Sequence, residues 1–421
     1  MSSVKIYLKN IGKVKEANIE IRGITVIGGE NNTGKSTVGK ALYSAFNSFV
    51  DAEGKLVNEK LLSIRRRLFG MDRVVHDMDR TSMNDLEILA EKIISLYDEH
   101  ESEDAIKEEL RSFFNVNEYV SEVDKERFKF GMDGVLETLR ISAQAYVKIL
   151  TQKIFATEFN QQINNILEKE NGQIILSIKG KDSVITIGQD KILNVTKGID
   201  ILTEAIYLDD PFIIDEIPSR FSGIRYNGHK EDTRAALYNP IENNLFDEIV
   251  AENRINKILG KINDACHGDI FLKNKNELMY KQENTGATYK VANLSTGLKS
   301  FAILQTLLLN GTIKDGGVII LDEPEIHLHP EWQLIFAELI VMLQKEFGLH
   351  ILLNTHSPYF LQAIEVFAKT YGISDKCDYY LSYNKGNESY FAHVNGEVDK
   401  IYAKLARPLQ VLEDLRFEYE G

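Results

Sequence analysis

Two kinds of hydrophobic spacing divide the chain, and together they predict an α/β protein. Apolar and polar residues alternate over 4–8 and 17–21, which predicts two strands, and residues 24–27 form a short apolar strand that ends in two glycines. A helix is predicted to follow these glycines over about 35–46. From Val318 onward, strand patterns alternate with helix patterns, as a parallel sheet requires. Other strand patterns occupy 173–178, 183–187 and 205–208, and a helical pattern occupies about 240–266.

The segment 51–164 has a different character. It is rich in charge, it contains no proline, and its apolar residues recur at helical spacing. No heptad persists over several repeats, which favours a packed group of helices over a long coiled coil. We therefore predict a helical insertion at 51–164 within a discontinuous head formed by 1–50 and 165–421. One face of a helix in the insertion would carry Leu86, Leu89, Ala90, Ile93 and Tyr97.

Composition limits the class of protein. The 421 residues are 43% hydrophobic and 27% charged, as in a soluble globular protein. The chain has no apolar run of membrane-spanning length and no signal-peptide pattern at Met1, so we expect a cytoplasmic protein without a membrane partner. Cys266 and Cys377 have no metal-binding spacing and imply no disulfide framework. The net charge of −14 argues against a uniformly basic surface that coats nucleic acid, but a local basic groove stays open.

The first motif follows the strand at 24–27. Residues 29–36 read GENNTGKS, which fits the phosphate-loop pattern G-x-x-x-x-G-K-[ST] between a strand and a helix. Its glycines let backbone N–H groups wrap a phosphate, and the helix adds its positive end. Lys35 would reach the β- and γ-phosphates, and the Ser36 hydroxyl would bind Mg²⁺. The predicted ATP-binding residues here are Gly29, Asn31, Asn32, Thr33, Gly34, Lys35, Ser36 and Thr37.

Two carboxylates follow the buried-strand pattern at 318–321. Ligand sites of α/β proteins lie at the carboxyl ends of such strands, where Asp322 would bind the hydrated Mg²⁺. Glu323 would act as the general base that polarises the attacking water. For this motif alone, the alternative is a strand end with solvated acids. The preceding phosphate loop favours the catalytic interpretation.

Two further motifs keep the order of one class of ATPase. Residues 294–298, LSTGL, resemble the ABC signature LSGGQ, with Thr296 and Leu298 as departures, and an ordinary serine N-cap is the alternative. A second apolar strand, 351–354, is followed by His356, which matches the switch histidine of that class. Together these motifs resemble the ABC-type ATPase head of RecF, SMC and OLD-family proteins. In that family the signature serine and glycine, here Ser295 and Gly297, bind the γ-phosphate held by the other subunit.

The resemblance implies a fold and a role. The fold is an α/β ABC-type P-loop head with a mixed sheet, an antiparallel β lobe and the inserted helical subdomain. The activity is ATP hydrolysis with Mg²⁺ in a homodimer that sandwiches ATP, with Glu323, His356 and Lys35 as catalytic residues. The residues Asn31, Asn32 and Thr33 inside the phosphate loop and the run DEPEIHLHP at 322–330 favour the OLD-like branch. Only about 65 residues follow His356, too few for the Toprim nuclease module of OLD nucleases.

A stand-alone ATPase subunit of this branch, as in Septu-like or PARIS-like systems, is paired with a separate effector, such as a nuclease, in defence against phage. A RecF- or SMC-like ATPase of DNA repair or chromosome handling is the alternative, and a transporter subunit is disfavoured by the insertion. Arg65–Arg67, with Lys55 and Lys60, could lie over DNA, although a solvated helix face is the simpler interpretation. His327 and His329 invite a metal interpretation but lack a third ligand. The resemblance also implies a glutamine that joins the lid to the metal site, for which Gln161 and Gln162 are candidates, and plain surface glutamines are the alternative.

Overall fold

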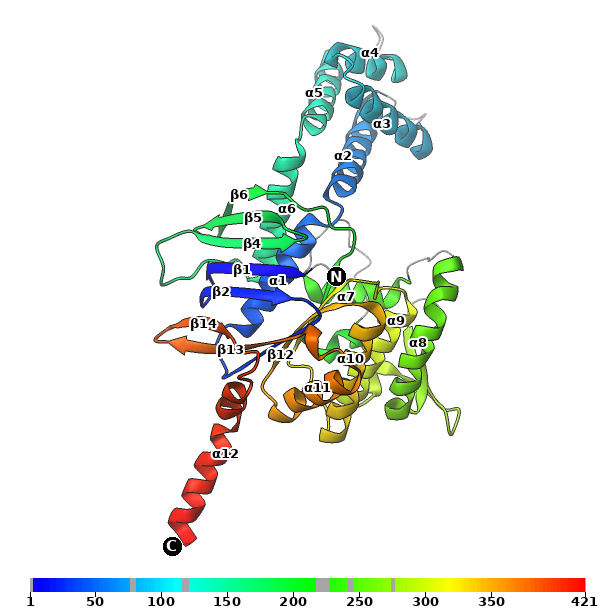
Figure 1. Cartoon of the computed structure of the whole chain (residues 1–421). Coiled ribbons are helices and arrows are strands. Elements are labelled where there is room, and N and C mark those ends of the chain that lie inside the picture. The colour runs from blue at the N-terminus through cyan, green and yellow to red at the C-terminus, as the bar shows by residue number, and fades with distance from the viewer. Residues whose placement is uncertain are drawn as a thin grey trace. The chain divides into compact units, whose positions relative to one another are not determined.

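The chain folds as two compact units (Figure 1). The computed structural model describes residues 3–75, 81–115, 121–216, 228–240, 245–273 and 277–420. Met1–Val50 and Leu150–Gly421 form the first unit, and Asp51–Ile149 form the second. The insertion was expected to end at residue 164, but helix α6 (Ala143–Glu158) carries the chain across the boundary. Its Gln152 binds the turn before β6, because its side chain bonds Asp190 O and Ile192 N at 3.2 and 2.6 Å.

In the described part of the first unit, eleven strands form one mixed sheet in the order β6-β5-β4-β1-β2-β14-β13-β3-β12-β11-β7. The bounds along the chain are β1 Val4–Ile11, β2 Val14–Ile21, β3 Ile24–Gly29, β4 Gly172–Ile178, β5 Lys181–Gly188, β6 Lys191–Thr196, β7 Ala205–Leu208, β11 Val318–Asp322, β12 His350–Thr355, β13 Cys377–Lys385 and β14 Glu388–His393.

The sheet has an antiparallel half and a parallel half. Strands β6, β5, β4, β1 and β2 pair antiparallel and form the predicted antiparallel lobe. Strands β13, β3, β12, β11 and β7 are all parallel. Strand β14 joins the halves, since it is antiparallel to β13 and parallel to β2. The predicted α/β fold with a mixed sheet is therefore confirmed.

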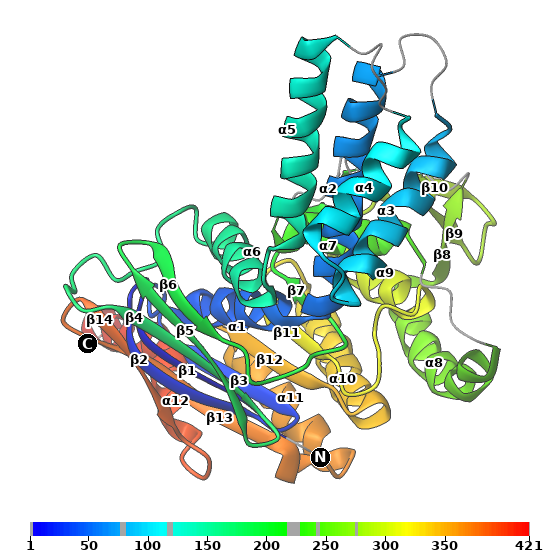
Figure 2. The ribbon, with the colours of Figure 1, turned by 90° about the horizontal axis from the view of Figure 1, so that it is seen from above.

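Helices cover both faces of the parallel half (Figure 2). In β11, Ile319 and Leu321 enter the main hydrophobic core with α10 (Pro330–Phe347) and α11 (Pro358–Thr370). Ile320 points the other way, to α1 (Lys35–Phe49), where a methyl group on Gly39 would lie 3.1 Å from its Cγ2. Both faces of the strand are thus buried, which explains its uninterrupted apolar sequence.

The remaining elements of the first unit complete the core. A small antiparallel sheet in the order β10-β9-β8, which the sequence did not predict, contributes buried Leu278 and Tyr280. The predicted helix at about 240–266 corresponds to α8, and residues 241–244 of that prediction lie outside the described residues. The bounds are α7 His229–Tyr238, α8 Leu245–Cys266, β8 Gly268–Lys273, β9 Glu277–Gln282, β10 Thr288–Lys290, α9 Thr296–Leu309, α12 Asp399–Glu420, and the short 3₁₀ helices Pro211–Asp215, Val291–Asn293 and Ser374–Lys376.

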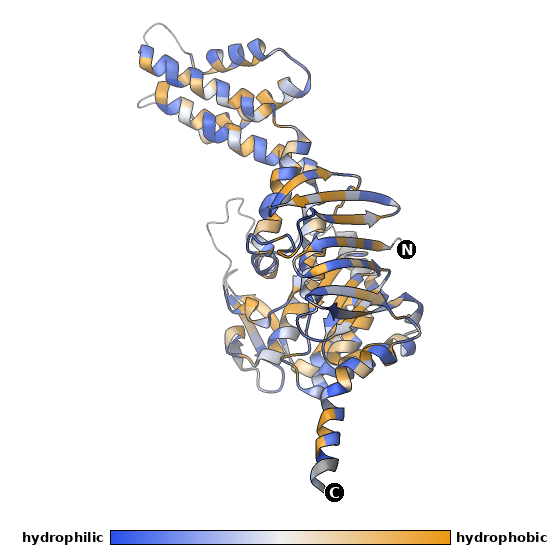
Figure 3. Ribbon diagram, turned by 90° about the vertical axis from the view of Figure 1, so that its left-hand side faces the viewer, coloured by the Kyte–Doolittle hydropathy of each residue, from blue (hydrophilic) through white to orange (hydrophobic). Residues whose placement is uncertain are grey.

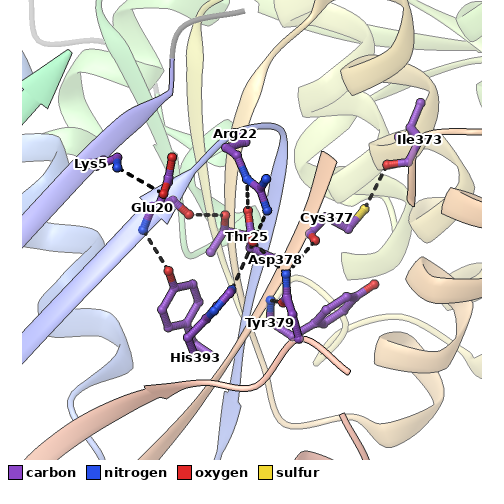
Figure 4. A network of polar contacts seen from close by, with 11 residues as sticks. Lys5, Glu20, Arg22, Thr25, Ile373, Cys377, Asp378, Tyr379 and His393 are labelled. Carbon is purple, nitrogen blue, oxygen red and sulfur yellow. Dashed lines mark hydrogen bonds and ion pairs between the residues drawn. The ribbon is translucent and has the colours of Figure 1, made fainter. Parts of the chain in front are cut away.

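A buried acid fastens the turn before β3 to the β13–β14 hairpin (Figure 4). Asp378 is 2% exposed and accepts hydrogen bonds from Arg22 Nε and Nη2 at 2.9 and 2.6 Å. It also accepts from His393 Nε2 at 3.1 Å and from Asn395 Nδ2 at 2.8 Å. Burial disfavours its charge, but Arg22 and these donors hold the pKa of Asp378 below its ordinary value. The network therefore stabilises the central strands that precede the phosphate loop.

The second unit has a core of its own. Helices α2 (Ala52–Val75), α3 (Met83–Asp98), α4 (Glu103–Phe113) and α5 (Glu122–Leu139) bury an apolar cluster that includes the predicted Leu86, Leu89, Ala90 and Ile93. Figure 3 shows hydrophobic and hydrophilic residues interleaved along these helices, as in amphipathic helices around a core. Arg65 pairs with Glu87 at 3.2 Å, and Lys60 donates to Leu139 O at 2.8 Å. Both cations are therefore engaged within the unit.

Candidate nucleotide-binding site

Three of the predicted motifs, the phosphate loop, the acid pair and the switch histidine, meet where three parallel strands end side by side. Strand β12 lies between β3 and β11, and the register pairs Thr355 with Gly28 and Asn354 with Asp322. The loops that follow these strands carry the phosphate-loop sequence, Glu323 and His356. The carboxyl edge of a parallel sheet is where α/β proteins bind ligands. The sheet thus brings together motifs that are up to about 320 residues apart in the sequence.

The phosphate loop has a backbone that only certain residues adopt easily. Asn32 and Gly34 have φ angles of 59° and 79°, in the left-handed region that asparagine and glycine tolerate best. A methyl group on Gly29 would lie 2.3 Å from Ser382 Oγ and 2.4 Å from Ser382 O of β13. Ser382 also bonds Thr33, with their hydroxyl oxygens 2.7 Å apart. Ser382 therefore supports the loop, a role that no local motif reveals.

Lys35 is buried at the start of α1, with 4% of its surface exposed. Its Nζ donates to Glu30 O at 2.8 Å and to Gly29 O at 3.3 Å, so the side chain lies against its own loop. Burial lowers the pKa of Lys35 to about 8, although the charges of Glu323, Asp322 and Glu325 oppose this shift. A triphosphate would supply the missing counter-charge at this position.

Asp322 is held at both of its carboxylate oxygens. Tyr207 of β7 donates its hydroxyl to Oδ2 at 2.9 Å, and Asn354 of β12 donates its amide to Oδ1 at 2.9 Å. Each oxygen retains a free lone pair, and Ser36, an exposed hydroxyl, follows Lys35 in the phosphate loop. A carboxylate and a hydroxyl beside phosphates are the hard oxygen donors that suit Mg²⁺. The residues present fit this ion.

Glu323 has a strained backbone and a histidine partner. Its φ angle is 52°, and its N–H donates to Asn354 O at 2.9 Å. Its Oε1 lies 2.6 Å from His356 Nε2. The hydrogen bond with His356, followed by the charges of His356 and Lys35, lowers the pKa of Glu323 despite partial burial. The side chain is therefore ionised at neutral pH and can accept a proton from water.

Glu325 supports the site, although the motif analysis gave this residue no individual role. It is buried, and its Oε1 accepts hydrogen bonds from Thr355 Oγ1 at 2.5 Å, His356 N at 2.9 Å and Ser357 N at 3.2 Å. Burial raises its pKa in spite of these donors. Glu325 thus fixes the loop that carries His356. An acid inside a Pro-rich turn was the only sequence signal for it.

The signature residues form a separate surface. Ser295 is the exposed N-cap residue of α9, and its side chain makes no capping hydrogen bond. Gly297 is buried, and a methyl group there would lie 2.8 Å from the Trp332 ring and 3.2 Å from His327 O. None of the residues that line the hollow here comes from the phosphate loop. They are Ser295, Thr296, Gly297, His327, His329 and Trp332.

Two weaker predictions gain no support from this geometry. His327 and His329 line the signature hollow, and the described part of the chain contains no group of three or more His, Cys, Asp or Glu side chains that could hold a metal ion. Gln161 and Gln162 are exposed in the turn after α6, where Gln161 N donates to Ala156 O at 2.8 Å. A role for either glutamine at the metal site stays a prediction.

Comparison with known proteins finds similar solved structures and a matching family model. None of the described helices is long and apolar enough to cross a membrane. An SMC head domain from Thermotoga maritima is 12% identical, with 94% of this chain and all of that chain covered and a TM-score of 0.41. A Pyrococcus furiosus Smc head with an extended coiled coil, bound to the C-terminal domain of ScpA, is also 12% identical, with coverage of 99% and 100% and a TM-score of 0.42. The family model described as AAA ATPase domain matches residues 1–361, so the chain belongs to the AAA ATPase domain family.

Proposed function

We propose that this chain hydrolyses ATP with Mg²⁺ and does so as a homodimer that closes around two nucleotides. The observation that supports this most strongly is the pair Glu323–His356, with 2.6 Å between Oε1 and Nε2, beside the buried Lys35. An ionised acid next to a phosphate-binding lysine is what activation of water at a γ-phosphate requires.

Each residue of the site has a separate role in ATP hydrolysis. Lys35 and the backbone N–H groups of the phosphate loop bind the β- and γ-phosphates. Ser36 and Asp322 would hold Mg²⁺, which would supply positive charge beside the phosphates. Glu323 takes a proton from water as the water oxygen bonds to the γ-phosphorus and the bond to the ADP oxygen breaks. His356 contacts the γ-phosphate and holds Glu323 in place. The products are ADP and inorganic phosphate.

A second copy completes the site. Ser295 is exposed at the N-terminus of α9, where its hydroxyl and the following N–H groups are free to meet a phosphate. The hollow around it has no phosphate-loop residue in its lining, so the same chain does not supply the ligand there. In a twofold dimer, Ser295 and Gly297 of each copy contact the nucleotide held by Lys35 of the other.

Glu323→Gln tests the whole proposal. The variant keeps its hydrogen bond to His356 but cannot accept a proton, so ATP binding persists, turnover falls at least about a hundredfold and a closed dimer accumulates. Size-exclusion chromatography with light scattering, in Mg²⁺ with ATP or ADP, measures the dimer. Glu331→Gln, an exposed acid on α10, is the control and behaves like the wild type. Normal turnover in Glu323→Gln would refute the assignment.

The biological role rests on the resemblance alone. We propose that the closed dimer controls a separate effector in defence against phage, as the OLD-like run at 322–330 suggests. The alternative is a DNA-handling ATPase, whose basic contact would include Arg65 and Lys60. Both of these side chains have partners within the second unit, which favours effector control. Co-purification of a neighbouring gene's product in ATP supports the effector, whereas ATPase activity stimulated by DNA and lost in Arg66→Ala supports DNA handling.

A further inference from the structure

A group of buried polar residues lies behind Asp322, in none of the motifs above. Tyr207 of β7 is completely buried, and its hydroxyl donates to Asp322 Oδ2 at 2.9 Å. The ring of His229, the first residue of α7, stacks on the Tyr207 ring with centroids 4.4 Å apart and planes at 26°. The orientation of the Tyr207 ring, and hence of its hydroxyl, is therefore set by His229.

His229 is in turn fixed by two acids. Its Nδ1 lies 2.7 Å from Glu158 Oε2, and its backbone N–H donates to Glu158 Oε1 at 2.6 Å. Its Nε2 lies 3.1 Å from Asp209 Oδ1, one residue past the end of β7. Both carboxylate oxygens of Glu158 thus hold the same residue. This bidentate contact leaves the His229 ring little freedom to turn.

Burying these polar side chains costs folding free energy, and a functional role would account for this cost. Glu158 and His229 are both buried, and taking charged groups out of water carries a penalty that a packed apolar pair would avoid. Supporting residues around a metal-binding carboxylate commonly set its orientation, and their loss typically reduces metal affinity or activity about 10- to 100-fold. Tyr207 has the geometry of such a support, since it bonds the carboxylate directly.

Glu158 also has a distinctive position in the chain. It is the last residue of α6, the helix that begins at Ala143 within the second unit and ends in the first. The chain therefore leaves the insertion through α6, and the last side chain of this helix, Glu158, binds His229. A turn of the end of α6 would displace the His229 ring and, through it, the Tyr207 hydroxyl.

We propose that Tyr207 is a positioning residue for the metal-binding carboxylate of Asp322. Because Glu158 binds His229 and His229 stacks on Tyr207, the end of α6 also helps to position this carboxylate. The proposal rests on the proposed function, because it assigns Asp322 to Mg²⁺. It adds a route by which the insertion controls the site: a displacement of α6 weakens the hold on Mg²⁺ without touching the phosphate loop.

Tyr207→Phe tests the first step by a measurement that needs no turnover. Calorimetry compares the affinity for ADP in Mg²⁺ with the affinity for ADP in EDTA. The variant should lose about tenfold of its affinity for MgADP and none of its affinity for metal-free ADP. In steady-state assays, the Mg²⁺ concentration that gives half-maximal ATPase activity rises. Equal losses of affinity with and without Mg²⁺, or no loss at all, would overturn the positioning role.

Tyr43→Phe is the matched control. Tyr43 of α1 is buried in the same cluster, with its ring 6.1 Å from that of Tyr207, but its hydroxyl bonds Asp232 instead of Asp322. Removing this hydroxyl disturbs packing and stability to a similar degree. The ratio of MgADP to ADP affinity should stay at the wild-type value. A shift in this ratio equal to that of Tyr207→Phe would show a general effect of the cluster and overturn the proposal.

Two variants of Glu158 test the link to α6. Glu158→Ala releases His229 and should lower MgADP affinity severalfold, while Glu158→Gln, which can still bond the backbone and ring of His229, restores most of it. Wild-type MgADP affinity in a folded Glu158→Ala protein overturns the α6 step. Should Glu158→Ala fail to fold, Glu158→Asp, too short to reach both atoms, replaces it. A wild-type protein that binds ADP equally with and without Mg²⁺ would instead refute the proposed function.

Discussion

The charge of Lys35 depends on its surroundings. The protein buries this amine against two carbonyl oxygens, and its pKa falls to about 8. A triphosphate favours the protonated form, so binding ATP above pH 8 requires Lys35 to take up a proton. The affinity for ATP is therefore constant up to about pH 8 and falls above it, approaching tenfold per pH unit. Titration of a fluorescent ATP analogue from pH 6.5 to 10 measures this decline.

Lys35→Arg separates this effect from general loss of structure. Arginine stays charged throughout this range, so whatever affinity the variant retains should change little between pH 7 and 9. A parallel fall in both proteins would attribute the decline to another group and contradict the role given to the Lys35 amine.

His229 produces a second pH dependence, in this case of the folding stability. Burial disfavours its charge, but the neighbouring carboxylates of Asp209 and Glu158 raise its pKa to about 9 from an ordinary 6.5. The folded state therefore binds the proton more tightly, and the resulting stability is complete below about pH 6.5 and lost as the pH rises through 9. His229→Gln should lower the free energy of unfolding by on the order of 3 kcal/mol at pH 6. Urea unfolding at pH 6 and pH 9 checks that this loss shrinks at the higher pH.

Local motifs identify the residues proposed to bind nucleotide and miss the residues that position their side chains. Lys35, Asp322 and Glu323 stand in short patterns beside strands, where spacing alone indicates a phosphate site. Tyr207 and Glu158 are separated from their partners by 115 and 71 residues. Nothing in a single sequence marks such pairs, because each depends on which strands and helices become neighbours after folding. The sequence signal at Tyr207 is only an aromatic residue in a strand.

The C-terminal helix supports the strand that leads into the phosphate loop. Ile401 of α12 is fully buried, and a methyl group on Gly28 would lie 2.3 Å from its Cγ2, so helix and strand are in close contact. Ile401→Ala should reduce the free energy of unfolding by about 2–4 kcal/mol and weaken ATP binding severalfold, because the cavity forms beneath the loop. Chemical denaturation and nucleotide titration measure the two effects.

Leu412→Ala on the same helix is the control. Leu412 is 63% exposed, so its truncation should change the free energy of unfolding by less than about 0.5 kcal/mol and leave ATP binding intact. Equal effects of the two substitutions would show that α12 acts through its helical stability and not through its contact with Gly28.

Among the helices and strands, those with strong sequence patterns were predicted and those with weak patterns were not. The apolar strands β3, β11 and β12 and the helix α1 were identified, because burial on both faces produces a continuous apolar run. The sequence pattern did not predict that β14 pairs antiparallel with β13. The direction of pairing is set by the β13–β14 turn and not by composition. The end of the insertion was placed too late because α6 keeps one helical pattern across the boundary between the units.

At the scale of the whole molecule, the proposed function requires parts of two chains in each active site. Lys35→Ala removes the nucleotide from its own phosphate loop, and Ser295→Arg blocks the surface that meets the partner's nucleotide. Each variant alone is inactive, because every site of its homodimer has one defective half. A mixed dimer contains one site with both defects and one intact site.

Random pairing makes half of the dimers mixed, so an equal mixture should recover about one quarter of wild-type ATPase activity. Steady-state phosphate release measures this recovery after the two proteins exchange subunits, and an excess of either variant lowers it. Activity that stays at the level of the separate variants, although mixed dimers form, would place Ser295 and Lys35 in one chain's site and remove the reason for closure around ATP.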